Sequence, residues 1–244
     1  MLNNKAEMFS TKKGVIAVKS PVKQKILHKL ANGEKTGREI RKNLERAKST
    51  ISVHLSDLEE LGLIKEKTCS SDKRKKVYSL TADFFGRSQT PSNQHYKKIL
   101  KNLRSSAGDS DKLLRSLFHL IRYGFDSLGI NVGPALKEIG RDAGKSLAKN
   151  FDSVNLSELL KEIKKFWKDN KLGEIKINDN FLLVYDCFDC GGMPDINETV
   201  CSLDEGMIEG IIKERTGEKI SVQEVECFGT GENRCKFKMS SSDS

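Results

Sequence analysis

The pattern that most constrains the fold lies between residues 20 and 82, where three short helical segments precede a strand, a basic turn and a second strand. Ser20 and Pro21 are typical of a helix start. The third helix carries a stripe of apolar residues at i, i+4 and i+7, which are Ile51, Leu55 and Leu58. Helices joined by a tight turn and followed by a hairpin predict a winged helix-turn-helix.

The outward face of the third helix is polar near its start. A recognition helix reads base edges with its first residues, and short side chains let its backbone enter the major groove. A basic turn between two strands suits contact with phosphates. We therefore predict base-edge contacts from Lys48, Ser49, Thr50, Ser52, Val53 and His54, and phosphate contacts from Lys73, Arg74, Lys75 and Lys76.

The positive charge of the chain is confined to its first third. Residues 1–86 contain 19 Lys and Arg against 10 Asp and Glu, whereas residues 87–244 contain 24 of each kind. From residue 170 onward, 15 acidic residues face 8 basic ones. This division indicates a basic module that binds double-stranded DNA, joined to a module with another task. A Lys-rich solubilising surface would give the same totals.

The helix and wing also resemble a known family. Within residues 20–82, "STISVHLSDLEELGLIKEK" looks like the recognition helix and wing of the ArsR-type winged-helix repressors. Many metal sensors of that family place a Cys-x-Cys pair in the preceding helix. The corresponding segment here, "REIRKNLERAKST", contains neither cysteine nor histidine. Metal sensing by that route is therefore not expected.

The middle of the chain reads as a linker followed by helices. "GRSQTPSNQ", residues 86–94, is polar and carries Gly and Pro. The following helical segment has a broad apolar face, formed by Leu113, Leu114, Leu117, Phe118, Ile121 and Phe125. Such a face packs either on the C-terminal domain or on a second copy of the chain. Because operators read by this type of module are two-fold symmetric, a homodimer is one expectation, and His119 is expected in a core or interface.

Five of the six cysteines fall within the 49 residues from Cys187 to Cys235. The sequence has no apolar run long enough to span a membrane and no secretory signal, so we expect a cytoplasmic protein. Thiols are normally kept reduced there. The cluster therefore favours metal binding or redox chemistry over structural disulfides.

The cysteine-rich end has the pattern of an α+β domain. "EIKINDNFLLVYDCFDC" predicts two strands, residues 202–215 predict a helix with a capping box from Ser202 to Glu205, and a hairpin follows. The expected fold class is α+β, with an N-terminal winged helix-turn-helix and an antiparallel C-terminal sheet. The expected domains are a DNA-binding domain at 1–86, linker and dimerisation helices at 87–129, and a cysteine-rich sensor domain at 130–244.

Three interpretations of the cysteines remain open: inert core residues, a zinc site and a thiol switch. A zinc site would use Cys187, Cys190, Cys227 and Cys235. Cys227 and Cys235 flank a hairpin turn, and a bond between facing strands would be strained and easily reduced. The redox candidates are Cys187, Cys190, Cys201, Cys227, Cys235 and, in the wing, Cys69.

The C-terminal pattern resembles the 4-vinyl-reductase domain, a small-molecule-binding module, over residues 130–240. The resemblance rests on Cys201 ahead of "LDEGMIEGII" and on "VQEVECFGTGENRCKFKM". A winged helix joined to this domain is similar to the methanogen-specific redox regulators of transcription. It implies a regulator whose C-terminal cysteines sense oxidation. The cysteine spacing makes zinc a candidate metal, and we expect no required cofactor.

The sequence contains no dinucleotide or flavin motif, so we expect a regulator and not an enzyme. The alternative is an enzyme or carrier that binds a tetrapyrrole or another hydrophobic small molecule.

Overall fold

The structure is a computed structural model that describes residues 5–42, 44, 47–68, 75–91, 93–193 and 195–241. It consists of two compact units, residues 1–89 and residues 90–244. Each unit has its own hydrophobic core.

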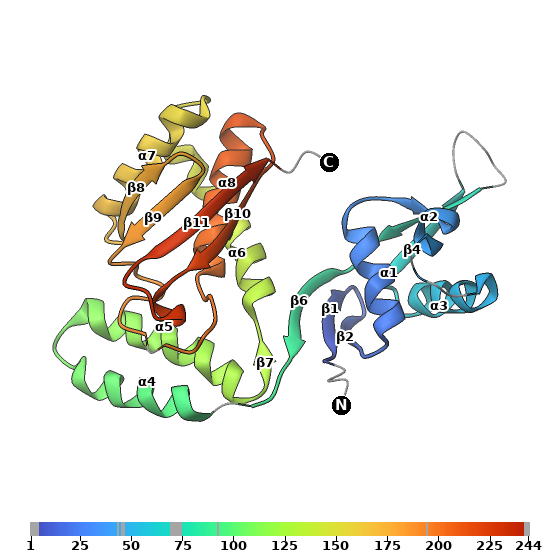
Figure 1. The fold of residues 1–244 in the computed structure, drawn as a ribbon, viewed down its shortest axis with the longest axis horizontal. Helices are drawn as coiled ribbons and strands as arrows, with labels where there is room; N and C mark the ends of the chain where they lie inside the picture. The colour runs from blue at the N-terminus through green and yellow to red at the C-terminus, as the bar shows by residue number, and fades with distance from the viewer. Residues whose placement is uncertain are drawn as a thin grey trace. The chain divides into compact units, whose positions relative to one another are not determined.

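The first unit contains short helices and antiparallel strands (Figure 1). Its elements are β1 (Glu7–Thr11), β2 (Gly14–Val18), α1 (Pro21–Ala31), β3 (Lys35–Thr36), α2 (Gly37–Arg41), α3 (Lys48–Glu60), β4 (Ile64–Thr68), β5 (Lys76–Leu80) and β6 (Asp83–Ser88).

The winged helix-turn-helix expected from the sequence is present in this unit. Ser20 caps α1 by accepting a hydrogen bond from the main-chain N–H of Lys23, and Pro21 occupies the first turn. The stripe of α3 is buried as expected. Strands β4 and β5 pair in the antiparallel register Ile64↔Leu80 to Thr68↔Lys76.

The first unit also contains a hairpin that the sequence did not predict. Strand β1 pairs with β2 and with β6, both in antiparallel register. Because β6 continues to Ser88 and α4 begins at Asn93, the segment between the two elements is shorter than the polar stretch at residues 86–94.

The second unit combines helices with one antiparallel sheet. Its elements are α4 (Asn93–Ser105), α5 (Ser110–Ser127), β7 (Ile130–Asn131), α6 (Gly133–Leu147), η1 (Ala148–Asn150), α7 (Leu156–Asp169), β8 (Glu174–Asn178), β9 (Phe181–Tyr185), α8 (Ser202–Thr216), β10 (Ile220–Glu226), η2 (Phe228–Thr230) and β11 (Cys235–Ser241).

The sheet of the second unit has the strand order β10-β11-β9-β8, and every neighbouring pair is antiparallel (Figure 1). Helix α7 packs against β8 and helix α8 packs against β10, while α4 and α5 pack on each other. Trp167 of α7 is fully buried in this core, as an anchor residue should be. The α+β class expected from the sequence is confirmed.

Helices α6 and α8 approach each other closely because glycines face the contact from both sides. A Cβ on Gly144 of α6 would lie 2.1 Å from the carbonyl oxygen of Met207. A Cβ on Gly206 of α8 would lie 2.0 Å from the carbonyl oxygen of Lys137. Real Cβ atoms do not come so near to backbone oxygens, so only glycine permits this packing.

The start of α8 differs from the expected capping box. Its N-cap residue is Cys201, whose side chain makes no capping hydrogen bond, and Ser202 is already the first residue of the helix. Glu205 is buried instead, where it accepts a hydrogen bond from the main-chain N–H of Glu224 and pairs with Lys137 at 2.9 Å. The carboxylate is committed to the α8–β10 contact, so the capping prediction was wrong.

In the part of the chain that the structure describes, no helix is both long and apolar enough to cross a membrane.

Candidate functional site

The first residues of α3 form an exposed surface. The residues from Lys48 to Thr50, together with Ser52 and Val53, are exposed, and His54 is half-buried. The helix buries its opposite face in the core of the first unit. This arrangement leaves the side chains expected to read base edges free of the core.

The wing is described only in part. Lys73, Arg74 and Cys69 lie outside the described residues. Lys75 is exposed, and Lys76 forms an ion pair of 2.9 Å with Glu66 on the neighbouring strand. Hydrogen bonding to Glu66 raises the pKa of Lys76, so this lysine keeps its charge but shares it with a carboxylate.

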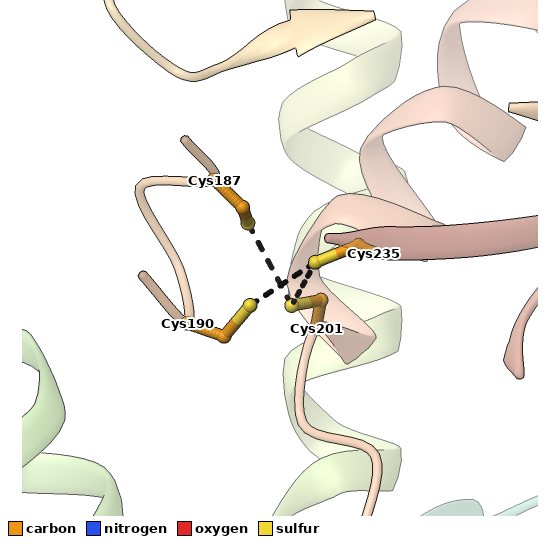
Figure 2. A group of neighbouring side chains, drawn as sticks. All are labelled: Cys187, Cys190, Cys201 and Cys235. Atoms are coloured by element: carbon orange, nitrogen blue, oxygen red, sulfur yellow. Dashed lines mark hydrogen bonds between the residues drawn. The ribbon is translucent and has the colours of Figure 1, made fainter. Parts of the chain in front are cut away.

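Four cysteine side chains meet in the core of the second unit (Figure 2). Cys187 and Cys190 follow β9, Cys201 precedes α8, and Cys235 begins β11. Their Sγ atoms all lie within 4.8 Å of one another, and all four residues are fully buried. The chain therefore brings together thiols from three separate segments.

The sulfur positions fit a tetrahedral metal site. A Zn–S bond of about 2.3 Å places neighbouring sulfurs of a tetrahedron about 3.8 Å apart. The Sγ separations are 3.8 Å for Cys187–Cys201, 3.7 Å for Cys201–Cys235 and 3.1 Å for Cys190–Cys235. Of these three pairs, the last would need to move apart for all four thiolates to bind one Zn²⁺ ion.

This set contains Cys201 where the sequence analysis placed Cys227. Cys227 lies beside Cys190 in a second group that includes the Glu224 carboxylate. Its Sγ lies 3.8 Å from the carbonyl oxygen of Glu198. The structure brings all five clustered cysteines into one region, but the expected pair Cys227–Cys235 is not among its sulfur–sulfur contacts within the described residues.

The cluster contains thiols in different electrostatic environments. Hydrogen bonding from Cys190 lowers the pKa of Cys227 to about 3 and lowers that of Cys187 as well. Burial raises the pKa of Cys201, and hydrogen bonding to Cys187 raises those of Cys190 and Cys235. Cys187 and Cys227 are therefore the thiols that lose their protons first.

Three buried carboxyl groups add to this concentration of acidic groups. Burial raises the pKa of Asp189 to about 7 and that of Glu224 to about 8, and it raises the pKa of Asp204 well above its ordinary value. Asp204 Oδ2 lies 3.4 Å from Cys187 Sγ. A bound cation would stabilise such a site, because it offsets the cost of burying several negative charges.

One buried cation, Arg122 of α5, reaches the segment between the first two cysteines. Its Nη2 donates a hydrogen bond of 3.2 Å to Asp189 Oδ2, and its Nη1 lies 3.0 Å from Oδ1. His119, one turn earlier, bonds to the carbonyl oxygen of Asp189 at 2.8 Å. Burial lowers the pKa of His119 to about 4, so the neutral imidazole donates this bond.

The sequence analysis did not identify Arg122, Asp189, Asp204 or Glu224 as site residues. A signal for Arg122 was available, since Arg115, His119 and Arg122 recur at i, i+4 and i+7 and therefore share one face of the helix. The three carboxylates offered no such signal, because their burial depends on contacts distant in sequence. His119 was expected in a core or interface, and it is buried.

Comparisons with known proteins agree with the two-part organisation. Residues 20–66 match the arsR family of bacterial regulatory proteins, and residues 180–240 match the 4-vinyl-reductase domain.

Two proteins of Methanocaldococcus jannaschii resemble the chain in sequence. MJ0150 is 30% identical over 125 residues, which are 50% of this chain and 72% of that protein. MJ1642 is 31% identical over 127 residues, 51% of this chain and 75% of that protein.

A crystal structure of a vinyl-4-reductase family protein from Methanocaldococcus jannaschii is a more distant match. It shares 20% identity and a TM-score of 0.38, and the match covers 62% of this chain and 96% of that chain. The sequence matches are the stronger finding: the chain belongs to the 4-vinyl-reductase domain family and carries an arsR-type helix-turn-helix ahead of that domain.

Proposed function

We propose that the chain is a transcription regulator that binds double-stranded DNA and responds to oxidation through its cysteine cluster. The arsR-type helix-turn-helix supports DNA binding, and the 4-vinyl-reductase domain supports a sensor role. The observation that carries the redox part is the group of four buried Sγ atoms within 4.8 Å of one another. Inert core cysteines have no physical reason to converge from three segments.

In the reduced state the cluster binds one zinc ion through Cys187, Cys190, Cys201 and Cys235. The sulfur separations support this donor set, and the buried carboxyl groups around it favour a cation. A bound metal would keep the thiols as thiolates and hold the three segments together. Glu224 and Cys227 lie at the edge of the set as alternative ligands.

Oxidation joins Cys190 and Cys235, whose Sγ atoms are 3.1 Å apart, nearer than those of Cys187–Cys201 or Cys201–Cys235. With a peroxide as oxidant, the two thiolates lose two electrons and form one S–S bond. The peroxide O–O bond breaks, and its two oxygens accept these electrons together with two protons from the solvent. Two thiolates of the proposed four then remain as metal ligands, which is too few for a stable structural site.

The change reaches helix α5 through the segment between Cys187 and Cys190. Arg122 and His119 hold this segment from one side of α5, through Asp189. If the cysteines change partners, the position of Asp189 changes and α5 must repack or lose a buried ion pair. The cluster thereby acquires two states with different packing of α5, which is what regulation requires.

We also propose that the opposite face of α5 binds a second copy of the chain. Leu114, Ile121 and Leu128 are spaced by seven residues and are 60%, 63% and 72% exposed. Apolar residues at this spacing form a seam between two helices. A homodimer presents two recognition helices to a two-fold symmetric operator, so repacking of α5 alters the spacing of those helices.

The decisive experiment measures binding of the purified protein to DNA upstream of its own gene, by fluorescence anisotropy, with reductant and after peroxide. We expect a change in affinity that reductant reverses, and about one zinc ion per reduced chain. Cys235→Ser should abolish the response and lower the zinc content, while the Cys69→Ser control should retain both. If the zinc content depends on Cys227 and not on Cys187, the metal site is instead the second group, formed by Cys190, Glu224 and Cys227.

An identical affinity in oxidised and reduced protein would refute the redox mechanism. A coloured protein that carries a tetrapyrrole or flavin and does not bind DNA would instead favour an enzyme or a carrier.

A further inference from the structure

A cavity of about 250 Å³ lies beside the cysteine-bearing segment, between the end of α4, the first turns of α5 and the Gly191–Gly192 turn. Since a water molecule occupies about 30 Å³ of liquid, the cavity has room for a small ion with some of its hydration. All of its lining residues belong to the second unit.

The charged side chains that line this cavity are all basic. Lys112 and Arg115 line it, and none of the described residues that line it carries a carboxylate. Two larger cavities of the same unit differ, because Glu209 and Glu214 line one and Asp179 lines the other. The smaller cavity therefore attracts anions, whereas the larger ones have no such preference.

Several hydrogen-bond donors of the cavity are unused. Arg115 forms no ion pair with any residue that the structure describes, and its guanidinium stacks over the Phe188 ring at 5.4 Å. The Ser116 hydroxyl and the main-chain N–H of Gly192 have no hydrogen-bond partner among the described residues. Lys112 pairs with Asp109 at 3.0 Å, but this pair is exposed and easily exchanged.

His119 contributes no positive charge to the cavity that it lines. Burial lowers its pKa to about 4, and its Nε2 is engaged by the carbonyl oxygen of Asp189. The attraction of the cavity for anions therefore rests on Lys112 and Arg115, and it persists at neutral pH.

We propose that this cavity binds a small oxyanion of the phosphate or sulfate class. A guanidinium group bonds two oxygens of such an anion at once, and hydroxyl and amide donors can bond the others. The site is next to the cysteine cluster, since Arg115 lies against Gly191, which directly follows Cys190. The charged residues that would hold the oxyanion, Lys112 and Arg115, are not among the proposed zinc ligands.

The test is isothermal titration of the full-length protein with sodium phosphate, at an ionic strength held constant with sodium chloride. We expect binding that Arg115→Gln weakens by about tenfold or more, because a charged hydrogen-bonding partner is lost. Lys112→Gln should also weaken it, and since the Lys112 side chain is 72% exposed this change cannot disturb the core. Arg104→Gln on α4 is the control, because this exposed residue lies outside the cavity.

The proposed DNA-binding surface of the first unit can also attract phosphate. The two cavity variants separate the sites, because phosphate bound on the first unit would be unaffected by them. Equal weakening in Arg104→Gln, or unchanged binding in both cavity variants, would overturn the proposal. Sulfate and glycerol phosphate are titrated alongside. Equal affinities would assign the site to free inorganic oxyanions, and tighter binding of glycerol phosphate would assign it to the phosphate group of a metabolite.

Discussion

Arg122 of α5 and Asp189 of the cysteine-bearing segment form an ion pair in which both side chains are buried, with exposed fractions of 7% and 4%. Arg122 Nη2 donates to Asp189 Oδ2 at 3.2 Å, and Nη1 stands 3.0 Å from Oδ1. The pair connects the Cys187–Cys190 segment to the helix whose other face is apolar and exposed. It is thus a direct physical link between the cluster and α5, together with the hydrogen bond from His119 to the Asp189 carbonyl oxygen.

Loss of one partner of this pair should lower the free energy of unfolding. Arg122→Gln leaves the Asp189 carboxylate buried without its cation, and such a change costs about 3–5 kcal/mol. Urea denaturation of the reduced protein measures it. The matched control is Asp111→Asn, which breaks the exposed Lys171–Asp111 pair of 2.9 Å and should change the stability little, because solvent screens exposed pairs. Similar losses in both variants would show that the buried pair does not hold the segment.

His119 should make the stability of the second unit depend on pH. Burial depresses its pKa to about 4, whereas an unfolded histidine has a pKa near 6.5. The unfolded chain therefore binds more protons between these values, so stability is fully present above pH 6.5 and is lost as the pH falls towards 4.

The variant His119→Gln removes this titration and retains a donor for the Asp189 carbonyl oxygen. Between pH 6.5 and pH 4, the unfolding free energy of the variant should fall by about 3 kcal/mol less than that of the unaltered chain. Chemical denaturation at both pH values measures the difference. Parallel pH profiles for the two proteins would contradict the prediction.

The packing of α6 on α8 should tolerate no side chain at Gly144. Gly144→Ala places a Cβ 2.1 Å from a backbone oxygen, so the helices must separate, at a cost of about 3 kcal/mol or more. Gly124→Ala in α5 is the control, because the nearest atom to its new Cβ would be 3.9 Å away. Its effect should stay within about 1 kcal/mol and can be stabilising. Thermal unfolding of both variants distinguishes a packing effect from a general preference for glycine.

Replacement of Lys73, Arg74, Lys75 and Lys76 by alanine should weaken binding to every DNA sequence. The logarithm of the affinity should also fall less steeply with the logarithm of salt concentration, with a slope smaller by about 3–4, since each lost phosphate contact removes about 0.9. The lower figure allows for the pairing of Lys76 with Glu66. A variant with alanine at Lys161, Lys164, Lys165 and Lys168 of α7 is the control for net charge. Thr50→Ala should instead alter the preference between sequences.

Glutamate at the exposed face of α5 should separate the proposed dimer. Leu114→Glu together with Ile121→Glu places charges on the seam, and light scattering should then report the mass of one chain. Val154→Glu introduces a charge at another exposed apolar residue, which is 69% exposed and outside α5, and should leave the mass unchanged. A dimer that survives the double substitution would show that another surface joins the copies.

The sequence by itself determined the features that depend on neighbours within a few residues. The stripe of α3, the cap of α1 by Ser20 and the strands β4 and β5 could all be read from local patterns. The same reasoning failed at α8, where Glu205 makes a contact with β10 in place of a capping box. A local motif such as a capping box forms only when no residue distant in sequence binds its side chain more strongly.

Only the tertiary structure decided which cysteines meet. The spacing of Cys227 and Cys235 suggested neighbours across a hairpin, but the register of β10 with β11 shifts after Glu224, and Cys235 lies opposite Val184 of β9. Its sulfur therefore faces Cys190 and Cys201, which come from loops at the ends of other elements. Side-chain direction in a sheet depends on strand register, and register is set by contacts across the whole sheet and not by residue spacing along the chain.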